Sequence, residues 1–306
     1  MTVVDRGAVL TVGTFDGVHR GHRLLLARLV AQARALDLRS TIVTFSPHPL
    51  EVVNPAAAPL LLTTEDERHS ALAAIGADAV VVLPFTLELS RLDAAQFVDQ
   101  VLVDRLQLRA LLVGYDHGLG RGRSGDVQVL RDLGQSRGFP VEVVSAVVGR
   151  DGLPVSSTSL RRAVAGGDLA RAADGLARPY SASGVVQHGA ERGRALGFRT
   201  INLGAPSPRK LLPPEGVYAI RATTVHGTFG GMLNLGPRPT FGDRSTTLEV
   251  HLFDAEGDWY GTSVRVEFLQ RLRDVRAFAD ADALVGQLRV DEQMARAVVA
   301  RSRAGI

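Results

Sequence analysis

The first half of the chain alternates short apolar runs with longer segments of helical periodicity. Apolar and β-branched residues predict five strands, at residues 8–12, 40–45, 79–83, 110–114 and 141–144. Helical spacing or composition marks the segments between them, at residues 24–36, 65–75, 93–106 and 127–137. Buried strands that alternate with helices indicate a parallel sheet covered on both faces, which binds ligands beyond the carboxyl ends of its strands. We therefore expect a Rossmann-like α/β domain over residues 1–178.

The pattern changes near residue 178, after two short predicted helices at residues 160–164 and 169–176. Beyond it, runs rich in β-forming residues are separated by turn residues, at 181–187, 216–224, 228–235, 247–253 and 263–268. Antiparallel strands that close into a small barrel fit these runs better than a second α/β layer does. One or two closing helices are expected at residues 280–299. The predicted fold class is α/β plus β, with the barrel domain over residues 179–306.

Composition agrees with two globular domains and excludes several kinds of chemistry. A chain of 306 residues exceeds what one hydrophobic core usually organises. Its 35 Lys and Arg against 32 Asp and Glu give a net charge of only +3, so no nucleic-acid partner is expected. The absence of cysteine removes disulfides, thiolate metal sites and cysteine nucleophiles. No apolar run approaches the ~18 residues of a membrane span, so we expect a cytoplasmic protein without a membrane partner, and a homo-oligomer stays open.

The segment after the first predicted strand has the features of an anion site. Residues 13–22 read GTFDGVHRGH, a glycine-punctuated loop that enters a helix. The first turn of a helix presents unpaired N–H groups and the positive end of its dipole, which favours a polyphosphate. His19 and His22 are three residues apart and therefore share one face, where both imidazoles can donate to phosphate oxygens. The alternative is a surface loop with two solvated histidines.

Three further segments of the first half carry polar chemistry. In residues 46–49, SPHP, two prolines hold the backbone extended around His48, which suits either a wall of the site or a structural turn. Residues 114–126 contain five glycines and two arginines, which suit a close approach to phosphate or a flexible surface loop. In residues 155–161, VSSTSLR, plain helix capping explains the serines but not Arg161, so we expect a second anion site there.

The second half contains a further set of candidate residues. Residues 188–203 form a glycine- and arginine-rich stretch that ends with Thr200 and Asn202, whose oxygens are hard donors of the kind that Mg²⁺ accepts beside substrate phosphates. The segment 234–241, NLGPRPTF, is rigid and suits a wall. On the predicted strand 247–253, Glu249 and His251 face one way, and a carboxylate on a rigid strand suits a general base. The alternative for Glu249 is an exposed strand residue.

Seven segments, in chain order, resemble the bacterial bifunctional riboflavin kinase/FMN adenylyltransferases, also called FAD synthetases. They are TVGTFDGVHRGH, TFSPHP, VSSTSLR, ARPYSASGVVQHGAERGRALGF, PPEGVYA, NLGPRPTF and LEVHLFD. The first contains His19-Arg20-Gly21-His22, which matches the HxGH signature of the α/β-phosphodiesterase-like nucleotidyltransferases. The resemblance covers nearly the whole chain.

This resemblance implies two ATP-dependent reactions and no covalent intermediate. The N-terminal domain would join FMN to ATP, giving FAD and pyrophosphate, and the C-terminal domain would phosphorylate riboflavin to FMN with ATP and Mg²⁺. In the first site, His19 and His22 would stabilise the attacked α-phosphate. The nucleotide would also contact Gly13, Thr14, Phe15, Asp16, Asp116, Ser157, Thr158 and Arg161.

For the second site, the resemblance implies a metal pair, Thr200 and Asn202, and a base, Glu249. The nucleotide would contact Gly193, Arg194 and Gly197. The flavin would contact Arg238 and Thr240 in this site, and His48 in the first site. In both reactions, positioning and electrostatics would carry the catalysis.

The chain departs from the family pattern in two places. Where the family usually has Pro-Thr-Ala-Asn, this chain has Arg199 and Ile201 around the predicted metal ligands. Where the family usually has aromatic residues after Asp116, the chain has residues 117–119, HGL. Three alternatives therefore stay open: the same fold with a changed flavin or nucleotide specificity, an enzyme with one inactive site, and a flavin-binding regulator.

Overall fold

The computed structural model describes residues 7–188, 197–204, 207–237 and 246–304. Contacts between residues divide the chain into two compact units, Met1–Ser159 and Leu160–Ile306. The domain boundary that the sequence predicts after residue 178 stays a prediction.

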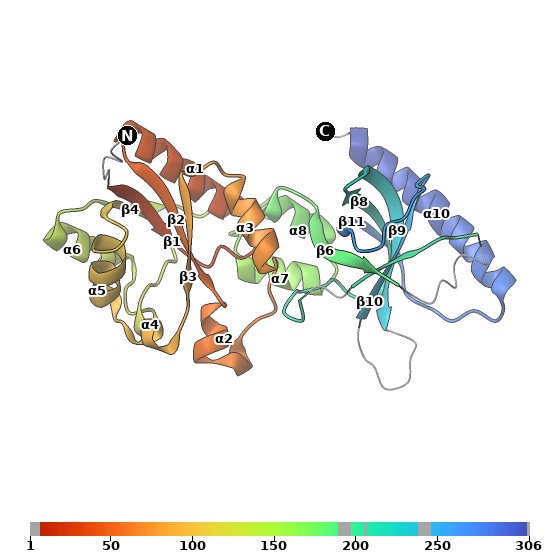
Figure 1. The fold of residues 1–306 in the computed structure, drawn as a ribbon, viewed down its shortest axis with the longest axis horizontal. Coiled ribbons are helices and arrows are strands. Elements are labelled where there is room, and N and C mark those ends of the chain that lie inside the picture. Colours follow the sequence, from red (N-terminus) through yellow and green to blue (C-terminus); the bar gives the residue numbers. More distant parts are fainter. Residues whose placement is uncertain (1–6, 189–196, 205–206, 238–245, 305–306) are drawn as a thin grey trace. The chain divides into compact units, whose positions relative to one another are not determined.

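The first unit is built on a five-stranded parallel sheet (Figure 1). Its strands are β1 (Ala8–Val12), β2 (Arg39–Ser46), β3 (Ala79–Pro84), β4 (Leu108–Gly114) and β5 (Val141–Val144). Their order across the sheet is β3-β2-β1-β4-β5, and every pair of neighbours is parallel. The predicted Rossmann-like sheet is therefore confirmed.

Helices cover both faces of this sheet. Its helical segments are α1 (Arg20–Ala35), α2 (Pro49–Val53), η1 (Pro55–Ala57), α3 (Glu65–Ala73), α4 (Leu87–Arg91), α5 (Ala94–Phe97), η2 (Val98–Val103), η3 (Arg121–Arg123), α6 (Val127–Arg137) and the start of α7 (Ser157–Ala165). One apolar cluster joins α1 and α3 to the sheet through residues such as Leu26 and Leu72. A second cluster joins α5, η2 and α6 to it through Phe97, Leu102 and Leu130. Burial on both faces explains why the strands read as continuous apolar runs.

One helical segment agrees with the prediction and another differs from it. Helix α1 begins at Arg20 with His19 as its N-cap residue, so it includes the predicted first turn at residues 19–22 as well as the periodic segment from residue 24. The segment predicted as one helix over residues 93–106 consists of α5 and the π-helical η2, in which the amide of Asp104 donates to the carbonyl of Asp99. Apolar periodicity does not reveal this widening, because the buried face stays continuous across it.

The second unit is a closed antiparallel barrel with helices. Its strands are β6 (Tyr180–Gln187), β7 (Ile201–Leu203), β8 (Gly216–Thr224), β9 (Gly227–Pro237), β10 (Thr246–Leu252) and β11 (Ser263–Arg273). They close in the order β10-β7-β6-β11-β8-β9, which confirms the predicted barrel. Two helices of this unit are α8 (Leu169–Leu176) and α10 (Ala281–Ala304). Strand β7 has only three residues and was not among the predicted strands.

Strand register separates the inside of the barrel from the face under α10. Tyr218, Leu233 and Val250 lie opposite one another on three neighbouring strands, and all three are fully buried. Their neighbours Ala219 and Met232 point the other way, and they pack with Ala295 and Val298 of α10. The predicted closing helix is therefore confirmed and covers an outer wall of the barrel.

One ion pair fixes α10 to the barrel. Asp291 is only 1% exposed, and the Arg273 guanidinium of β11 binds both of its carboxylate oxygens at 2.7 to 3.0 Å. Breaking such a pair leaves a buried charge uncompensated, so the contact holds the helix in one position.

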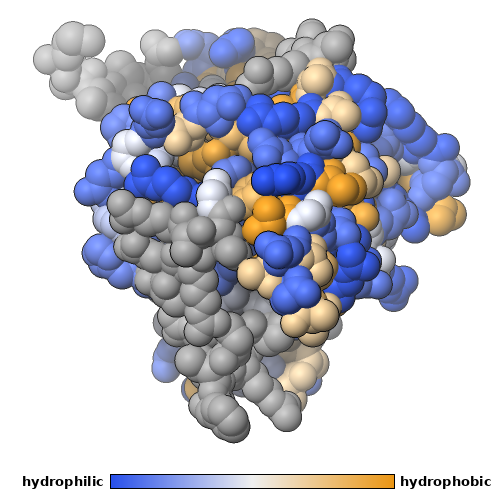
Figure 2. Space-filling model, turned by 90° about the vertical axis from the view of Figure 1, so that its right-hand side faces the viewer, coloured by the Kyte–Doolittle hydropathy of each residue, from blue (hydrophilic) through white to orange (hydrophobic). Residues whose placement is uncertain are grey.

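The surface on the side of α10 is mostly hydrophilic. Figure 2 shows its apolar residues in small groups among polar ones. Val290 and Met294, one turn apart on α10, are 48% and 44% exposed. A homo-oligomer stays a prediction. In the part of the chain that the structure describes, no helix has the length and apolar character needed to cross a membrane.

Candidate active sites

The strand order of the first unit locates its candidate site. The strand order reverses between β1 and β4, which are neighbours in the sheet. The loops that follow these two strands therefore flank the position where such sheets bind ligands. The loop at residues 13–19 follows β1, and the loop at residues 115–126 follows β4. Two of the predicted segments therefore lie at the same edge of the sheet.

The two predicted catalytic histidines lie against each other at the start of α1. His19 is the N-cap residue, and its Nδ1 accepts a hydrogen bond from the amide of His22 at 3.3 Å. The two imidazole rings are stacked, with centroids 3.6 Å apart, and the Phe15 ring meets His22 edge-on at 5.1 Å. Because capping uses the lone pair on Nδ1, a neutral His19 carries its proton on Nε2.

The environment of His22 keeps its imidazole uncharged. Burial holds the pKa of His22 well below its usual value of 6.5, and the neighbouring His19 lowers this pKa further. Nδ1 of His22 is buried and has no hydrogen-bond partner among the residues that the structure describes. Near neutral pH, His22 is therefore a neutral hydrogen-bonding group at the positive end of a 16-residue helix.

Asp16 points into the protein and supports the loop. Its side chain is fully buried and accepts three hydrogen bonds of 3.0 Å, from the amide of Leu62 and from the amide and hydroxyl of Thr63. Its own carbonyl accepts a hydrogen bond from the hydroxyl of Ser157 at 2.9 Å, at the start of α7. Asp16 and Ser157 thus join three segments of the first unit, and a contact of either with nucleotide stays a prediction.

The rest of the loop is closely packed. A Cβ atom on Gly21 would lie 3.2 Å from the His19 ring, and one on Gly13 would lie 3.0 Å from the Phe15 ring. The carbonyl of Thr14 accepts a hydrogen bond from the hydroxyl of Thr44 at 3.3 Å. Glycine at positions 13 and 21 therefore lets the two rings lie directly against the backbone.

The loop after β4 is an ordered turn rather than a loose connection. The amides and carbonyls of Leu119 and Gly125 bond each other at 2.8 and 3.0 Å. The Asp116 side chain is exposed, while its carbonyl accepts a hydrogen bond from Arg123 at 2.6 Å. Burial, together with the nearby Arg123, lowers the pKa of His117 to about 4, so this histidine is neutral. Nε2 of His117 has no partner among the described residues.

Three other predicted residues of this site lie at helices α2 and α7. His48 caps α2, because its Nδ1 accepts a hydrogen bond from the amide of Leu50 at 3.2 Å, and the residue is buried. Thr158 is exposed in the first turn of α7, and Arg161 follows on the same helix, in the stretch that contacts assign to the second unit. The roles of His48 in flavin binding and of Thr158 and Arg161 in nucleotide binding stay predictions. The predicted residues Gly193, Arg194, Arg238 and Thr240 lie outside the described residues.

In the second unit, three polar residues stand side by side on neighbouring strands. Asn202 of β7 and Asn234 of β9 are the register partners of Glu249 on β10, one on each side. Directly opposite residues have Cβ atoms roughly 5 Å apart. All three are half-buried, and no hydrogen bond joins their side chains to any other described residue. Asn234 was not predicted as a site residue, although its place opposite a candidate base could have indicated it.

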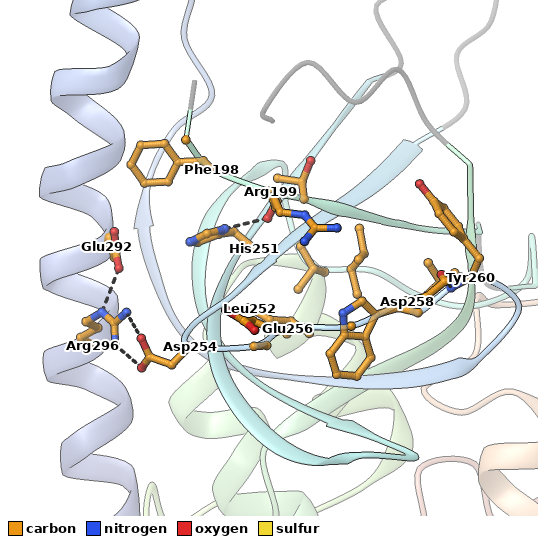
Figure 3. A pocket seen from close by; sticks show the side chains of 18 of the residues that line it. Phe198, Arg199, His251, Leu252, Asp254, Glu256, Asp258, Tyr260, Glu292 and Arg296 are labelled. Atoms are coloured by element: carbon orange, nitrogen blue, oxygen red, sulfur yellow. Dashed lines mark hydrogen bonds and ion pairs between the residues drawn. The ribbon is translucent and has the colours of Figure 1, made fainter. Parts of the chain in front are cut away.

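The second unit also has a cavity of about 1310 Å³ (Figure 3). Phe198, Arg199 and Thr200 line it just before β7, the segment from Asp254 to Tyr260 lines it after β10, and α10 also contributes to its wall. Gly197, a predicted nucleotide contact with φ +81°, also lines it. Thr200 therefore lies in the cavity, whereas the described lining does not include Asn202 or Glu249.

Arg296 connects α10 to the segment after β10 in the wall of this cavity. Its guanidinium binds both carboxylate oxygens of Asp254, at 2.8 and 2.9 Å, and it also bonds Glu292 at 2.9 Å (Figure 3). The guanidinium carbon lies 4.4 Å from the centre of the Phe253 ring. The hydrogen bonds that Arg296 donates to Asp254 lower the pKa of Asp254 and raise the pKa of Arg296.

Oxygen donors at positions 200 and 202 fit Mg²⁺. The ion keeps most of its ligands as water and substrate phosphate and needs only one or two protein oxygens. Neither side chain has a hydrogen-bond partner among the described residues, and the Glu249 carboxylate stands next to Asn202. Within those residues, no group of three or more His, Cys, Asp or Glu forms a metal site of another kind.

Comparison with known proteins agrees with this two-site architecture. The family model described as FAD synthetase matches residues 2–159, and the one described as riboflavin kinase matches residues 176–299. The bifunctional riboflavin kinase/FMN adenylyltransferase of Pseudomonas fluorescens is 41% identical, over 97% of this chain and 94% of that protein. The enzyme of the same name from Escherichia coli K12 is 38% identical, over 95% and 93%.

One solved structure matches nearly the whole chain. It is described as a macrolide-efflux protein from Streptococcus pneumoniae, and it aligns with a TM-score of 0.85 and 29% identity over 96% of this chain and 95% of that one.

A parallel-sheet nucleotidyltransferase unit followed by a barrel kinase unit defines a two-site, ATP-dependent transferase. The chain belongs to the bifunctional riboflavin kinase/FMN adenylyltransferase family. It is an enzyme of flavin cofactor biosynthesis, in which one unit makes FMN from riboflavin and the other makes FAD from FMN.

Proposed function

We propose that His19 and His22 stabilise the α-phosphate of ATP while the phosphate of FMN attacks it. The attacking oxygen forms the new P–O bond, and pyrophosphate leaves. Imidazole N–H groups at a helix N-terminus donate hydrogen bonds to the extra negative charge on the phosphate oxygens in the transition state. The stacked pair at the start of α1 is the observation that carries this assignment.

In the second unit we assign the base to Glu249. Its carboxylate would take the proton from the riboflavin hydroxyl as that oxygen attacks the γ-phosphate, and ADP leaves. Thr200 and Asn202 would hold Mg²⁺, which supplies positive charge to the transferred phosphoryl group. The alignment of Glu249 with Asn202 on adjacent strands carries this assignment.

The test is to incubate the purified full chain with riboflavin and saturating Mg-ATP and to separate the flavins by chromatography. FMN is expected first and FAD afterwards. Recovery of riboflavin alone would contradict the assignment of a working kinase site. A panel of ATP, CTP and GTP tests the alternative specificity, because turnover with CTP or GTP equal to that with ATP would favour it.

The metal assignment needs a separate measurement. Calorimetric titration of Mg²⁺ into the ADP-bound full chain should show a site that the Thr200→Val and Asn202→Leu variants weaken. Unchanged Mg²⁺ binding in both variants would remove the assignment. A cytoplasmic location and the absence of nucleic-acid or membrane partners stay predictions from the sequence.

A further inference from the structure

Arg199 lines the cavity of the second unit and forms no ion pair with the other residues that the structure describes. Among the described residues, three arginines line the cavity: Arg199, Arg289 and Arg296. Arg296 is committed to Asp254 and Glu292, whereas the Arg199 side chain has no hydrogen bond or ion pair with any other described residue. In Figure 3 the Arg199 side chain extends into the space between His251 and Tyr260.

The backbone of Arg199 is held in place by His251. Nδ1 of His251 lies 2.7 Å from the carbonyl oxygen of Arg199, and because a carbonyl only accepts, this nitrogen carries the proton. The His251 ring also meets the rings of Phe198 and Phe253, at 5.4 and 5.8 Å. A guanidinium that starts from a fixed backbone loses less conformational freedom when it binds a ligand.

The position of Arg199 also limits what it can bind. Its neighbour in the chain is Thr200, the proposed metal ligand, which lines the same cavity. Glu256 and Asp258, both exposed, also line the cavity. Their negative charges repel an anion that enters, so a nearby cation is needed to balance this repulsion. A guanidinium binds phosphate oxygens with two parallel N–H bonds, which a lysine cannot do.

We propose that Arg199 is a phosphate-binding residue of the kinase site, that it contacts the polyphosphate of the nucleotide, and that His251 positions it. This proposal rests on the kinase site being where the previous subsection puts it. The phosphate of FMN is the other anion that visits this site, and the experiment below separates the two.

The chain contains an intrinsic fluorescent probe of this cavity. Trp259 is the single tryptophan of the chain, and it lines the cavity, so its fluorescence reports ligands of the second unit. Titration of the full chain with ADP, in EDTA and then in Mg²⁺, gives the affinity of this site. The KM for ATP in riboflavin phosphorylation gives a second, independent measure.

The key variants are Arg199→Gln and Arg199→Lys. We expect Arg199→Gln to weaken ADP binding and to raise the KM for ATP by roughly 10- to 100-fold, the usual effect of losing a charge-assisted hydrogen bond. Arg199→Lys should recover only part of this loss. Riboflavin affinity and the formation of FAD from supplied FMN should change less than threefold.

The matched control is Arg289→Gln, which removes a cation that lines the same cavity from α10. It should leave ADP affinity within about threefold of the unmodified protein, as expected for a residue outside the contact. An equal loss of ADP affinity in Arg289→Gln would mean that only the overall charge of the cavity matters, which overturns the proposal. Weaker binding of FMN with unchanged binding of ADP in Arg199→Gln would also overturn it.

The role of His251 is tested by two substitutions of different chemistry. His251→Asn keeps an N–H group near the position of Nδ1, and His251→Leu keeps bulk without a donor. His251→Asn should keep the affinity for ADP. His251→Leu should lower the affinities for both ADP and ATP. If both variants fold and lose affinity equally, the hydrogen bond to Arg199 is not what positions the guanidinium.

Failure of the kinase assignment would look different. In that case the unmodified chain would form no FMN, and substitution of Glu249 would have no effect. The proposal for Arg199 fails alone if riboflavin is phosphorylated normally but the affinity for ADP does not respond to Arg199.

Discussion

The imidazole rings of His19 and His22 lie face to face, with their planes 18° apart and their centroids 3.6 Å apart. Two cations could not share this geometry without strong repulsion, and burial further disfavours the charged form of His22. The arrangement therefore keeps the pair neutral or singly charged. Such a pair is suited to donate hydrogen bonds as negative charge develops on a substrate, rather than to act as a permanently cationic site.

The lowered pKa of His22 makes the stability of the first unit depend on pH. The unfolded chain binds a proton at this residue below about pH 6.5, whereas the folded chain resists protonation until a much lower pH. The stabilisation is therefore complete above pH 6.5 and is lost as the pH falls below it. Scanning calorimetry of the full chain between pH 8 and pH 5 should show the first unit losing stability at the acidic end.

His22→Gln should flatten that pH dependence. The matched control is His69→Gln on the exposed side of α3, which should leave the slope as it is. An unchanged slope in His22→Gln, with both units folded, would show that other groups carry the acid sensitivity. His117, whose pKa is about 4, is the first candidate among them.

The two reactions should be separable by single substitutions. His22→Ala should lower FAD formation from FMN by about 10²- to 10⁴-fold and leave FMN formation intact, because its imidazole contributes only to the first site. Glu249→Gln should lower riboflavin phosphorylation by a similar factor and leave FAD formation from supplied FMN intact. Chromatographic rates with riboflavin or FMN as the starting flavin measure both. Loss of both activities in one folded variant would contradict two independent sites.

Asp16 should matter for stability as well as for adenylyl transfer. Replacing it with alanine leaves the amide groups of Leu62 and Thr63 buried without their acceptor. We expect the free energy of unfolding of the first unit to fall by about 2–4 kcal/mol. Denaturant unfolding should show this, while Asp66→Ala, at an exposed position in α3, should change stability by about 0.5 kcal/mol or less.

Much of the fold was predictable because burial leaves a strong periodic signal. The five parallel strands, the antiparallel barrel runs and the closing helix all follow from which residues avoid water. The same reasoning missed β7, because three residues are too few to show a period. It also missed the π-helical η2, since that segment buries the same face as an ordinary helix would.

The sites were only partly predictable. The spacing of His19 and His22 indicated one shared face, and the structure brings the two rings into contact. The inward direction of Asp16 could not be predicted, because its partners at residues 62–63 lie 46 residues or more away in sequence. Asn234 could be recognised as a candidate site residue only from the strand register, which places it opposite Glu249. Such contacts depend on tertiary pairing, which local sequence does not encode.

Arg296 should act on substrate binding in the kinase unit rather than on the chemical step. Its bonds to Asp254 fix the start of the segment that lines the cavity up to Tyr260, so Arg296→Gln should release that wall. We expect the KM values for riboflavin and ATP to rise roughly tenfold with little change in kcat, because misplaced walls weaken binding. Glu292→Gln, which removes only a bond within α10, should have a smaller effect. A fall in kcat with unchanged KM values would place Arg296 among the groups that act on the reacting atoms instead.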